Sequence, residues 1–424
     1  MVLKVPVSTG AVIFMHANKH VPIYKDLWAW SFALAVAGYP LVGLLSSVTG
    51  REDEKFSIIF RILVVGLCGL SFLISDRQKG WRFGDVWLFS FFGLYIMKLG
   101  IDVSYSIDGA SDALVFATVT SIVPAAFLAL STNTWSEVNV AWALFAVGTL
   151  TVAGIIWLQY SGSNAVLIDN TDRVYFERLN PISVGHAGLT ALISSYALIR
   201  IPQRTSVRML ILTVVAGAAT TIYLASARGP LVTLACCIIL LPALRPKFTT
   251  MLLSFLFLAS AVLVLAITDI TPLLDKFHLT VIGKDNSTTE RLGSISLSWD
   301  LFQQNPLFGY GTQLPLFLYP HNMLVEILQA MGLLGMTIFA MVFAKIGVAV
   351  KFLADRRLVL LPLLTAQAIV GAQFSGSLWG SASLWIIVTV LMFRVNAMRQ
   401  FDFWAHRRAM WRPYASGEAP SGAR

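Results

Sequence analysis

A histidine lies where a polar stretch meets a long apolar run, in Tyr319-Pro320-His321-Asn322. Pro320 restricts the conformation of the residues around it, and Asn322 is of a type that caps helices. The sequence therefore predicts that a helix begins just after His321. Because a helix start gathers unpaired N–H groups and a positive dipole end, an imidazole beside it tends to stay neutral and basic. The competing interpretation is a polar residue that marks a membrane interface.

Two arginines lie where they can bind an anion. Arg228 follows a strongly apolar run in Ser226-Ala227-Arg228-Gly229-Pro230, and Arg291 begins an amphipathic segment. A guanidinium fork binds two phosphate oxygens at once, so the pair predicts a phosphate or diphosphate site. The alternatives are that Arg228 snorkels to a membrane interface and that Arg291 is a solvated surface charge.

Three predicted helix starts carry related chemistry: Asn180-Pro181, Arg228-Gly229-Pro230 and Pro320-His321-Asn322. Proline is favoured at the first helical position, and each helix points its positive end to the same side of the predicted membrane. If these ends converge, they form an anion site before any side chain is counted.

Five further residues are weaker candidates for this site: Arg173, Arg178, His186, Asn322 and Glu326. The two arginines lie in a shorter loop and can be solvated charges. His186 lies just inside a predicted span and can be a satisfied buried histidine. Glu326 can line a cavity or have only a structural role.

Several chemistries lack their motifs. The sequence contains no Walker lysine loop, no His/Cys spacing for zinc, no Asp-x-Asp on an outer loop and no Gly-x-Ser-x-Gly. We therefore expect neither a metal nor a cofactor. The three cysteines lie in apolar runs and offer no disulfide framework. Despite a net charge of +9, the basic residues form no single patch, so no nucleic-acid partner is expected.

The composition is that of an integral membrane protein, because 57% of the 424 residues are hydrophobic and only 12% are charged. We predict an all-α fold of about twelve transmembrane helices. Within one of them, Lys98 and Asp102 are spaced to pair with each other. The predicted spans are, roughly, 27–48, 57–75, 85–106, 112–131, 139–160, 181–200, 206–226, 229–244, 248–268, 321–350, 357–373 and 376–396.

The distribution of Lys and Arg predicts the orientation. With a cytoplasmic N-terminus, the inner connections and tail carry 20 basic residues and the outer connections carry 8. Both termini are then cytoplasmic. Spans one to nine occupy residues 1–268 and the last three occupy 321–396. A basic tail, 397–424, is expected to be partly disordered.

Two long loops face away from the cytoplasm, at about 161–180 and 269–320. In the larger loop, Leu292, Ile295, Trp299 and Phe302 repeat at helical spacing. This pattern predicts an amphipathic helix that lies on the membrane surface or on the helix bundle.

Several of these residues fall into one block of about 50 residues: Arg291, Trp299, Asn305-Pro306-Leu307-Phe308-Gly309-Tyr310-Gly311-Thr312, Pro320-His321-Asn322, Glu326-Ile327 and Gly332-Leu333-Leu334-Gly335. The block resembles the O-antigen ligase/polymerase superfamily, whose members share an Arg, an amphipathic helix, a Pro-Leu-x-Gly-x-Gly turn and a His-Asn at the start of a span. Ser226-Ala227-Arg228-Gly229 is similar to the arginine turn that those proteins carry earlier. Within the superfamily, the size, the loop position and the layout of the spans are more similar to the O-antigen ligase of Gram-negative bacteria than to a polymerase.

The resemblance implies a membrane-embedded glycosyltransferase with a GT-C-like architecture in the bacterial inner membrane, acting in lipopolysaccharide biosynthesis. Its members transfer an O-antigen glycan from undecaprenyl diphosphate to a sugar hydroxyl of lipid A–core on the periplasmic face. Neither ATP nor a metal is implied, and no obligate protein partner is expected. Arg228 and Arg291 would bind the diphosphate, and His321 would act as a general base or only orient the diphosphate.

Other interpretations stay open. An O-antigen polymerase and a protein O-glycosyltransferase of the same superfamily would share the site and differ in acceptor. A transporter or lipid-linked glycan flippase belongs to another class, but no internal symmetry of the kind that transporters carry is evident in the sequence.

Overall fold

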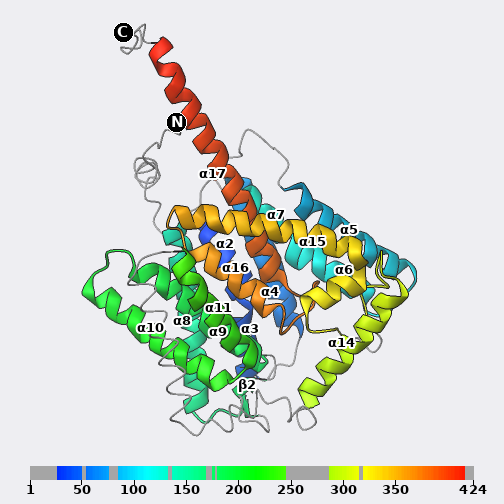
Figure 1. Ribbon diagram of the computed structural model, residues 1–424. Coiled ribbons are helices and arrows are strands. Elements are labelled where there is room, and N and C mark those ends of the chain that lie inside the picture. The colour runs from blue at the N-terminus through cyan, green and yellow to red at the C-terminus, as the bar shows by residue number, and fades with distance from the viewer. Residues whose placement is uncertain are drawn as a thin grey trace.

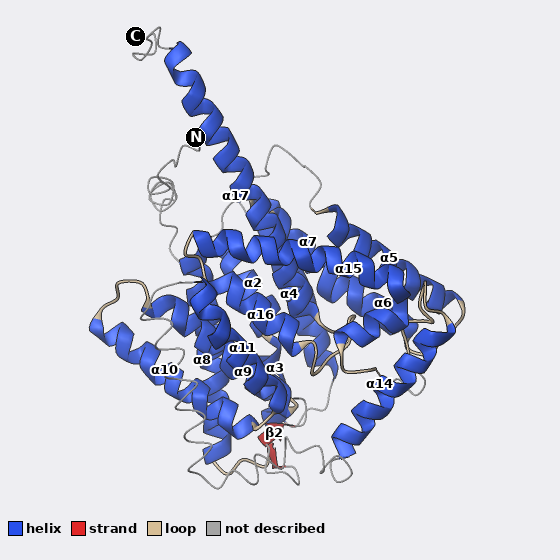
Figure 2. Ribbon diagram, viewed as in Figure 1, coloured by secondary structure: helices blue, strands red, loops and turns tan. Residues whose placement is uncertain are grey.

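The protein is a bundle of helices from which one long helix projects (Figure 1). This computed structural model describes residues 26–49, 54–75, 85–131, 136–168, 174–176, 179–244, 286–314 and 319–415. Helices account for most of this part of the chain, which also has one short pair of strands (Figure 2). The expected all-α membrane protein is confirmed at this level.

Eleven of the twelve predicted spans coincide with helices of the described chain. The remaining span, 248–268, lies outside the described residues. Within the described ranges, eight helices are long and apolar enough to cross a membrane, or nine with the bent pair α2–α3. A total of twelve therefore stays a prediction. The helices are α2 (Leu27–Ala37), α3 (Tyr39–Thr49), α4 (Glu54–Ile74), α5 (Val86–Ser104), α6 (Ala110–Val115), the π-helix η2 (Phe116–Ile122), α7 (Val123–Leu130), α8 (Glu137–Tyr160), α9 (Pro181–Ile199), α10 (Thr205–Ala225), α11 (Arg228–Leu244), α14 (Asn286–Gln304), α15 (Met323–Asp355), α16 (Leu360–Gly371) and α17 (Ala382–Ala415).

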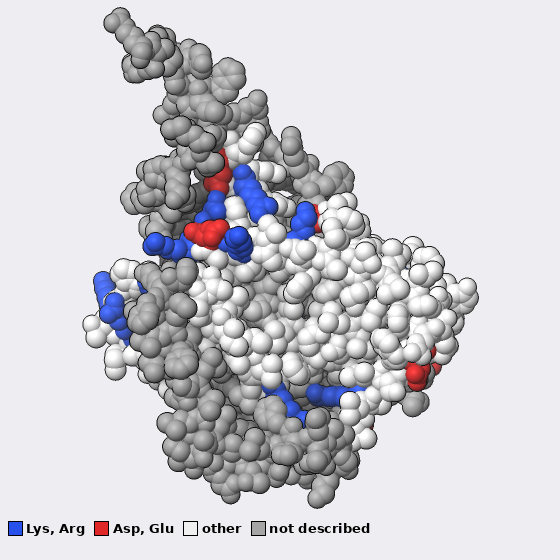
Figure 3. Space-filling view, viewed as in Figure 1, with Lys and Arg blue, Asp and Glu red and all other residues white. Residues whose placement is uncertain are grey.

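Small residues let the central helices approach closely. A Cβ on Gly148 of α8 would come within 3.0 Å of Ala191 in α9, and one on Gly188 of α9 would come within 2.9 Å of the Ala218 carbonyl in α10. Lipid tails provide no hydrophobic force between helices, so close backbone packing of this kind holds membrane bundles together. On the face drawn in Figure 3, the charged atoms lie near α17, near α10 and along the lower margin, with a broad uncharged area between them.

The predicted span 321–350 is not one straight helix. Gly332, at φ 64° and ψ −158°, breaks α15. The segment 305–312 docks at the break: the Leu333 N–H donates to the Pro306 carbonyl at 2.8 Å, and the Tyr310 N–H donates to the Gln329 carbonyl at 2.7 Å. Main-chain groups that the break frees are thus paired within the protein, as an apolar surrounding requires.

The Lys98–Asp102 pairing expected from their spacing is wrong. In the described chain, Lys98 Nζ instead donates to the Gly309 carbonyl at 3.3 Å. Asp102 is 2% exposed, and its Oδ2 accepts from the Thr312 N–H at 2.6 Å and from the Thr312 hydroxyl at 2.5 Å. Both side chains of α5 therefore bind the 305–312 segment. Its main-chain and hydroxyl groups need partners inside the bundle, and they take the place of the Lys98–Asp102 pair.

Three other elements differ in detail from the sequence prediction. The shorter loop contains an antiparallel strand pair, β1 (Val166–Ile168) and β2 (Val174–Phe176), that no pattern indicated. Helix α17 continues to Ala415, so the tail expected to be partly disordered begins as helix. Helix α14 forms where the amphipathic segment was predicted. Its inner face carries Ser294 and Ser298, whereas Trp299 is 46% exposed. Its apolar face thus points away from the bundle, as for a helix on a membrane surface.

Replacing Gly332 by alanine is expected to destabilise the fold. An L side chain is strained at φ 64°, and its Cβ would meet the Gly309 nitrogen at 2.5 Å and the Leu307 carbonyl oxygen at 2.6 Å. The strain alone costs about 1–3 kcal/mol, so the purified variant should unfold at a lower temperature in detergent. Gly347→Ala is the matched control in the same helix, because a Cβ there meets nothing within 4 Å. Equal melting temperatures for the two variants would contradict the close approach.

Candidate functional site

His321 lies just before α15, where the sequence predicted a helix start. Asn322 is the N-cap, and its Oδ1 accepts from the Leu324 and Val325 N–H groups, each at 3.1 Å. His321 itself adopts φ 53°, a left-handed conformation uncommon for a non-glycine residue. This turn packs the imidazole against the Tyr319 ring, with 4.1 Å between the ring centroids and 45° between the ring planes. Backbone geometry and ring contact therefore fix the orientation of the histidine.

The His321 imidazole is held neutral. Burial first, and then the positive charge of Arg291, lower the pKa of His321 to about 4. Arg291 opposes the raised pKa of Tyr319, whose main cause is also burial. The Arg291 charge therefore acts on both rings. Nδ1 of His321 is buried with no hydrogen-bond partner among the described residues. A neutral imidazole can accept a proton at neutral pH.

The loop between α16 and α17, residues 372–381, connects the candidate residues. Arg291 Nη1 donates to the Phe374 carbonyl at 3.2 Å, and Asn322 Nδ2 donates to the Gln373 carbonyl at 3.4 Å. The Met323 N–H donates to the Ala372 carbonyl at 3.1 Å. Three consecutive carbonyls of one loop thus hold Arg291 from α14 and the first residues of α15 side by side.

Glu326 secures the other end of the same loop. It is 1% exposed, and both of its carboxylate oxygens lie 2.9 Å from the Leu378 nitrogen. The Leu378 carbonyl in turn accepts from Trp385 Nε1 at 2.8 Å. The Glu326 side chain therefore faces the loop rather than an open cavity, and it stays a candidate through the position that it gives the loop.

Arg228 begins α11 beside this loop. A Cβ on the next residue, Gly229, would come within 3.0 Å of the Phe374 Cβ. One on Gly185, in the second turn of α9, would come within 2.5 Å of Pro230. The expected starts of α9, α11 and α15 are all confirmed. Their first two turns contact residues 371–374 or one another, and these contacts bring the three starts together. An anion site formed by their positive ends stays a prediction.

The remaining candidates are separate from this group or cannot be placed. The His186 ring packs against Gly371, where a Cβ would approach Cε1 at 2.8 Å, and its Nε2 has no partner among the described residues. Arg173 and Arg178 lie outside the described residues. In the described chain, no three His, Cys, Asp or Glu side chains are grouped as metal ligands.

The sequence missed the α16–α17 loop as part of the site. Its signal was a cluster of small residues, Ser375-Gly376-Ser377 and Gly380-Ser381, which is unusual inside a membrane span. Helix α16 has 12 residues, about 18 Å, and is too short for the roughly 30 Å of a bilayer core. The loop therefore lies among the helices, and the site is built on its main chain.

Comparison with known proteins matches residues 214–340 to the O-antigen ligase family. Over these residues the chain is similar to the O-antigen ligase superfamily. The matched segment contains Arg228, Arg291, His321 and Glu326, whereas Arg173, Arg178 and His186 fall outside it. Proteins of this superfamily are glycosyltransferase-like enzymes, ligases or polymerases, that in general act on lipid-linked glycans. No curated protein matches the chain.

The lowered pKa of His321 predicts a pH dependence of stability. In the unfolded chain a histidine titrates near pH 6.5, so between about 6.5 and 4 the unfolded state binds more protons than the folded state. Stability from this group is complete above pH 6.5 and is lost as the pH falls toward 4. His321→Asn should therefore lose less thermal stability than the wild type between pH 7 and pH 5. Identical losses would show that His321 is not buried as described.

Proposed function

We propose that the protein transfers a glycan from undecaprenyl diphosphate to a sugar hydroxyl of lipid A–core, as an O-antigen ligase. The observation that carries the proposal is the neutral His321 beside the Arg291 guanidinium, within the segment that matches the family. A neutral base next to a fixed positive charge suits a reaction that removes a proton and releases an anion.

The reaction follows from these groups. The acceptor hydroxyl gives its proton to His321 as its oxygen bonds to the anomeric carbon of the donor sugar. The bond between that carbon and the diphosphate oxygen breaks, and the electron pair leaves with the diphosphate. Arg291 and Arg228, with the starts of α11 and α15, stabilise the negative charge that develops on the leaving group. One displacement inverts the anomeric configuration. Because these cations supply the positive charge, the proposal requires neither a metal nor ATP.

The proposed site opens to the periplasm and the chain spans the bacterial inner membrane, with both termini in the cytoplasm. The support is the excess of Lys and Arg on the connections opposite the His321 side. The outward apolar face of α14 fits a helix resting on that membrane surface, with Arg291 turned toward the loop. A lipid-linked donor can then present its diphosphate from the bilayer.

The decisive experiment is a transfer assay with purified full-length protein in detergent, undecaprenyl-diphosphate glycan and lipid A–core, with EDTA and no ATP. We expect glycan on lipid A–core. Longer glycan that stays on undecaprenyl diphosphate would instead make the protein a polymerase. A folded protein that changes neither lipid would contradict both activities and favour a protein acceptor or a transporter.

Replacing His321 by asparagine tests the base. Asparagine tolerates positive φ better than alanine, so His321→Asn keeps the turn but cannot take the proton. We expect the rate of transfer to fall about 10²–10⁴-fold, with donor binding retained. His406→Asn is the matched control, because it removes a histidine of the basic tail, outside the family segment, and should leave the rate within a few-fold. A His321→Asn enzyme at the wild-type rate would leave the histidine at most an orienting role.

A further inference from the structure

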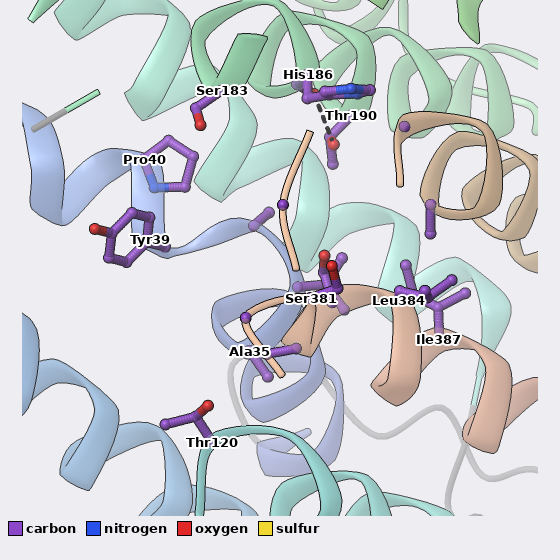
Figure 4. Close-up of a pocket in the computed structure, with 18 of the residues that line it drawn as sticks. Ala35, Tyr39, Pro40, Thr120, Ser183, His186, Thr190, Ser381, Leu384 and Ile387 are labelled. Carbon is purple, nitrogen blue, oxygen red and sulfur yellow. Dashed lines mark hydrogen bonds between the residues drawn. The ribbon is translucent and has the colours of Figure 1, made fainter. Parts of the chain in front are cut away.

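A second site lies on the other side of the α16–α17 loop. A cavity of about 560 Å³ is bounded by the α2–α3 bend, α4, η2, α9 and the loop itself. Figure 4 shows Tyr39 and Thr120 facing Ser381 and Leu384 across it, with His186 and Thr190 at one end. Tyr39 is 41% exposed, so the cavity reaches the protein surface where α2 meets α3. Its size is that of a small-molecule or lipid site.

An arginine lines this cavity within a membrane-crossing helix. Arg61 is the one charged residue of the span Phe56–Ile74. Its Cζ lies 4.3 Å from the Phe116 ring centroid and 5.8 Å from that of Tyr39. Tyr39 lies at the α2–α3 bend and Phe116 in the π-helix η2, so the two rings hold the guanidinium between these elements rather than at the end of α4. A charge in a span costs about 2.5–3.5 kcal/mol, and such residues mark functional sites.

Three irregular stretches of backbone meet at the same cavity. Helices α2 and α3 bend by 63° at Gly38, and Tyr39 and Pro40 of the bend line the cavity. Phe116 and Thr120 belong to the π-helix, and the α16–α17 loop supplies the opposite wall. Membrane proteins place non-helical backbone where it is buried or lines a cavity, and π-helices are frequent at functional sites. The irregularity therefore points to a site rather than to a packing defect.

We propose that this cavity binds the phosphate group of a membrane lipid, with the Arg61 guanidinium on the phosphate and the lipid chain along the apolar wall. Arginine is the side chain best suited to phosphate, and the Tyr39 hydroxyl adds a donor. The apolar wall includes Leu34, Val64 and Leu384. On the outer surface of α4, Ile59 is 62% exposed and Ile62 is 64% exposed, so a lipid can approach from the bilayer.

The cavity borders the same α16–α17 loop as the His321 site, and Ala372 takes part in both, but neither His321 nor Arg291 lines the cavity. One set of loop groups binds Arg291, Asn322 and Glu326, and another set lines the cavity. The shared chemistry is a lipid phosphate, from a phosphorylated glycolipid acceptor or from a bilayer phospholipid. The interpretation of the ligand as a glycolipid acceptor rests on the proposed function, whereas binding of a bilayer phospholipid does not.

The test measures binding to the purified full-length protein in detergent micelles by native mass spectrometry. The probe is dioleoyl phosphatidic acid. The control lipid is dioleoylglycerol, which has the same acyl chains but lacks the phosphate. We expect phosphatidic acid to bind at least about tenfold more tightly than dioleoylglycerol, and Arg61→Gln to remove most of that difference. Arg61→Lys should restore part of it. Arg208→Gln, the same charge change on an exposed position of α10, should leave it unchanged.

Competition then identifies the source of the phosphate. Displacement by bisphosphorylated lipid A but not by phosphatidylglycerol supports the site as an acceptor subsite, and the reverse supports it as a phospholipid site. Displacement by inorganic phosphate alone would overturn a lipid site, as would equal binding of phosphatidic acid to the wild type and Arg61→Gln. His321→Asn should bind as the wild type does, so a failed transfer assay leaves this result intact.

Discussion

A peptide group placed among membrane helices has no water to bond, and this constraint organises the site. The α16–α17 loop has to pair its main-chain groups inside the protein. It does so with Arg291, Asn322, Met323 and Glu326, which come from α14 and the start of α15. The same bonds that satisfy the loop therefore position the candidate residues.

Arg291 has two effects that act at different stages. Without an anion its charge adds to burial in keeping the proton off His321. A bound diphosphate would offset that charge, so the imidazole would attract a proton more strongly once the donor is in place. The base would gain strength when the acceptor hydroxyl has a sugar to attack, which disfavours proton transfer at an empty site.

The sequence predicted much of this arrangement, but not its supports. Asn322 as a cap, the starts of α9 and α11 and the position of α14 follow from local residue types, and the structure has them. The partners of Lys98 and Asp102 could not be predicted, because they lie more than 200 residues away in sequence. The role of the loop was missed because it binds the site residues through main-chain groups, which every residue type carries, and its small residues show only that the chain is irregular there. The roles of Arg228, Arg291 and His321 in transfer stay predictions.

The docking of the 305–312 segment has a consequence for how such chains can diverge. A Cβ on Gly309 would lie 2.5 Å from the Met331 nitrogen, and one on Gly332 would lie 2.5 Å from the Gly309 nitrogen. The main chain of the 305–312 segment contacts the main chain of α15 here. Each glycine leaves the space that the main chain near the other glycine occupies. Substituting either glycine alone would push the two stretches of backbone apart. We therefore expect a chain of this fold either to keep both glycines or to join α14 to α15 in another way.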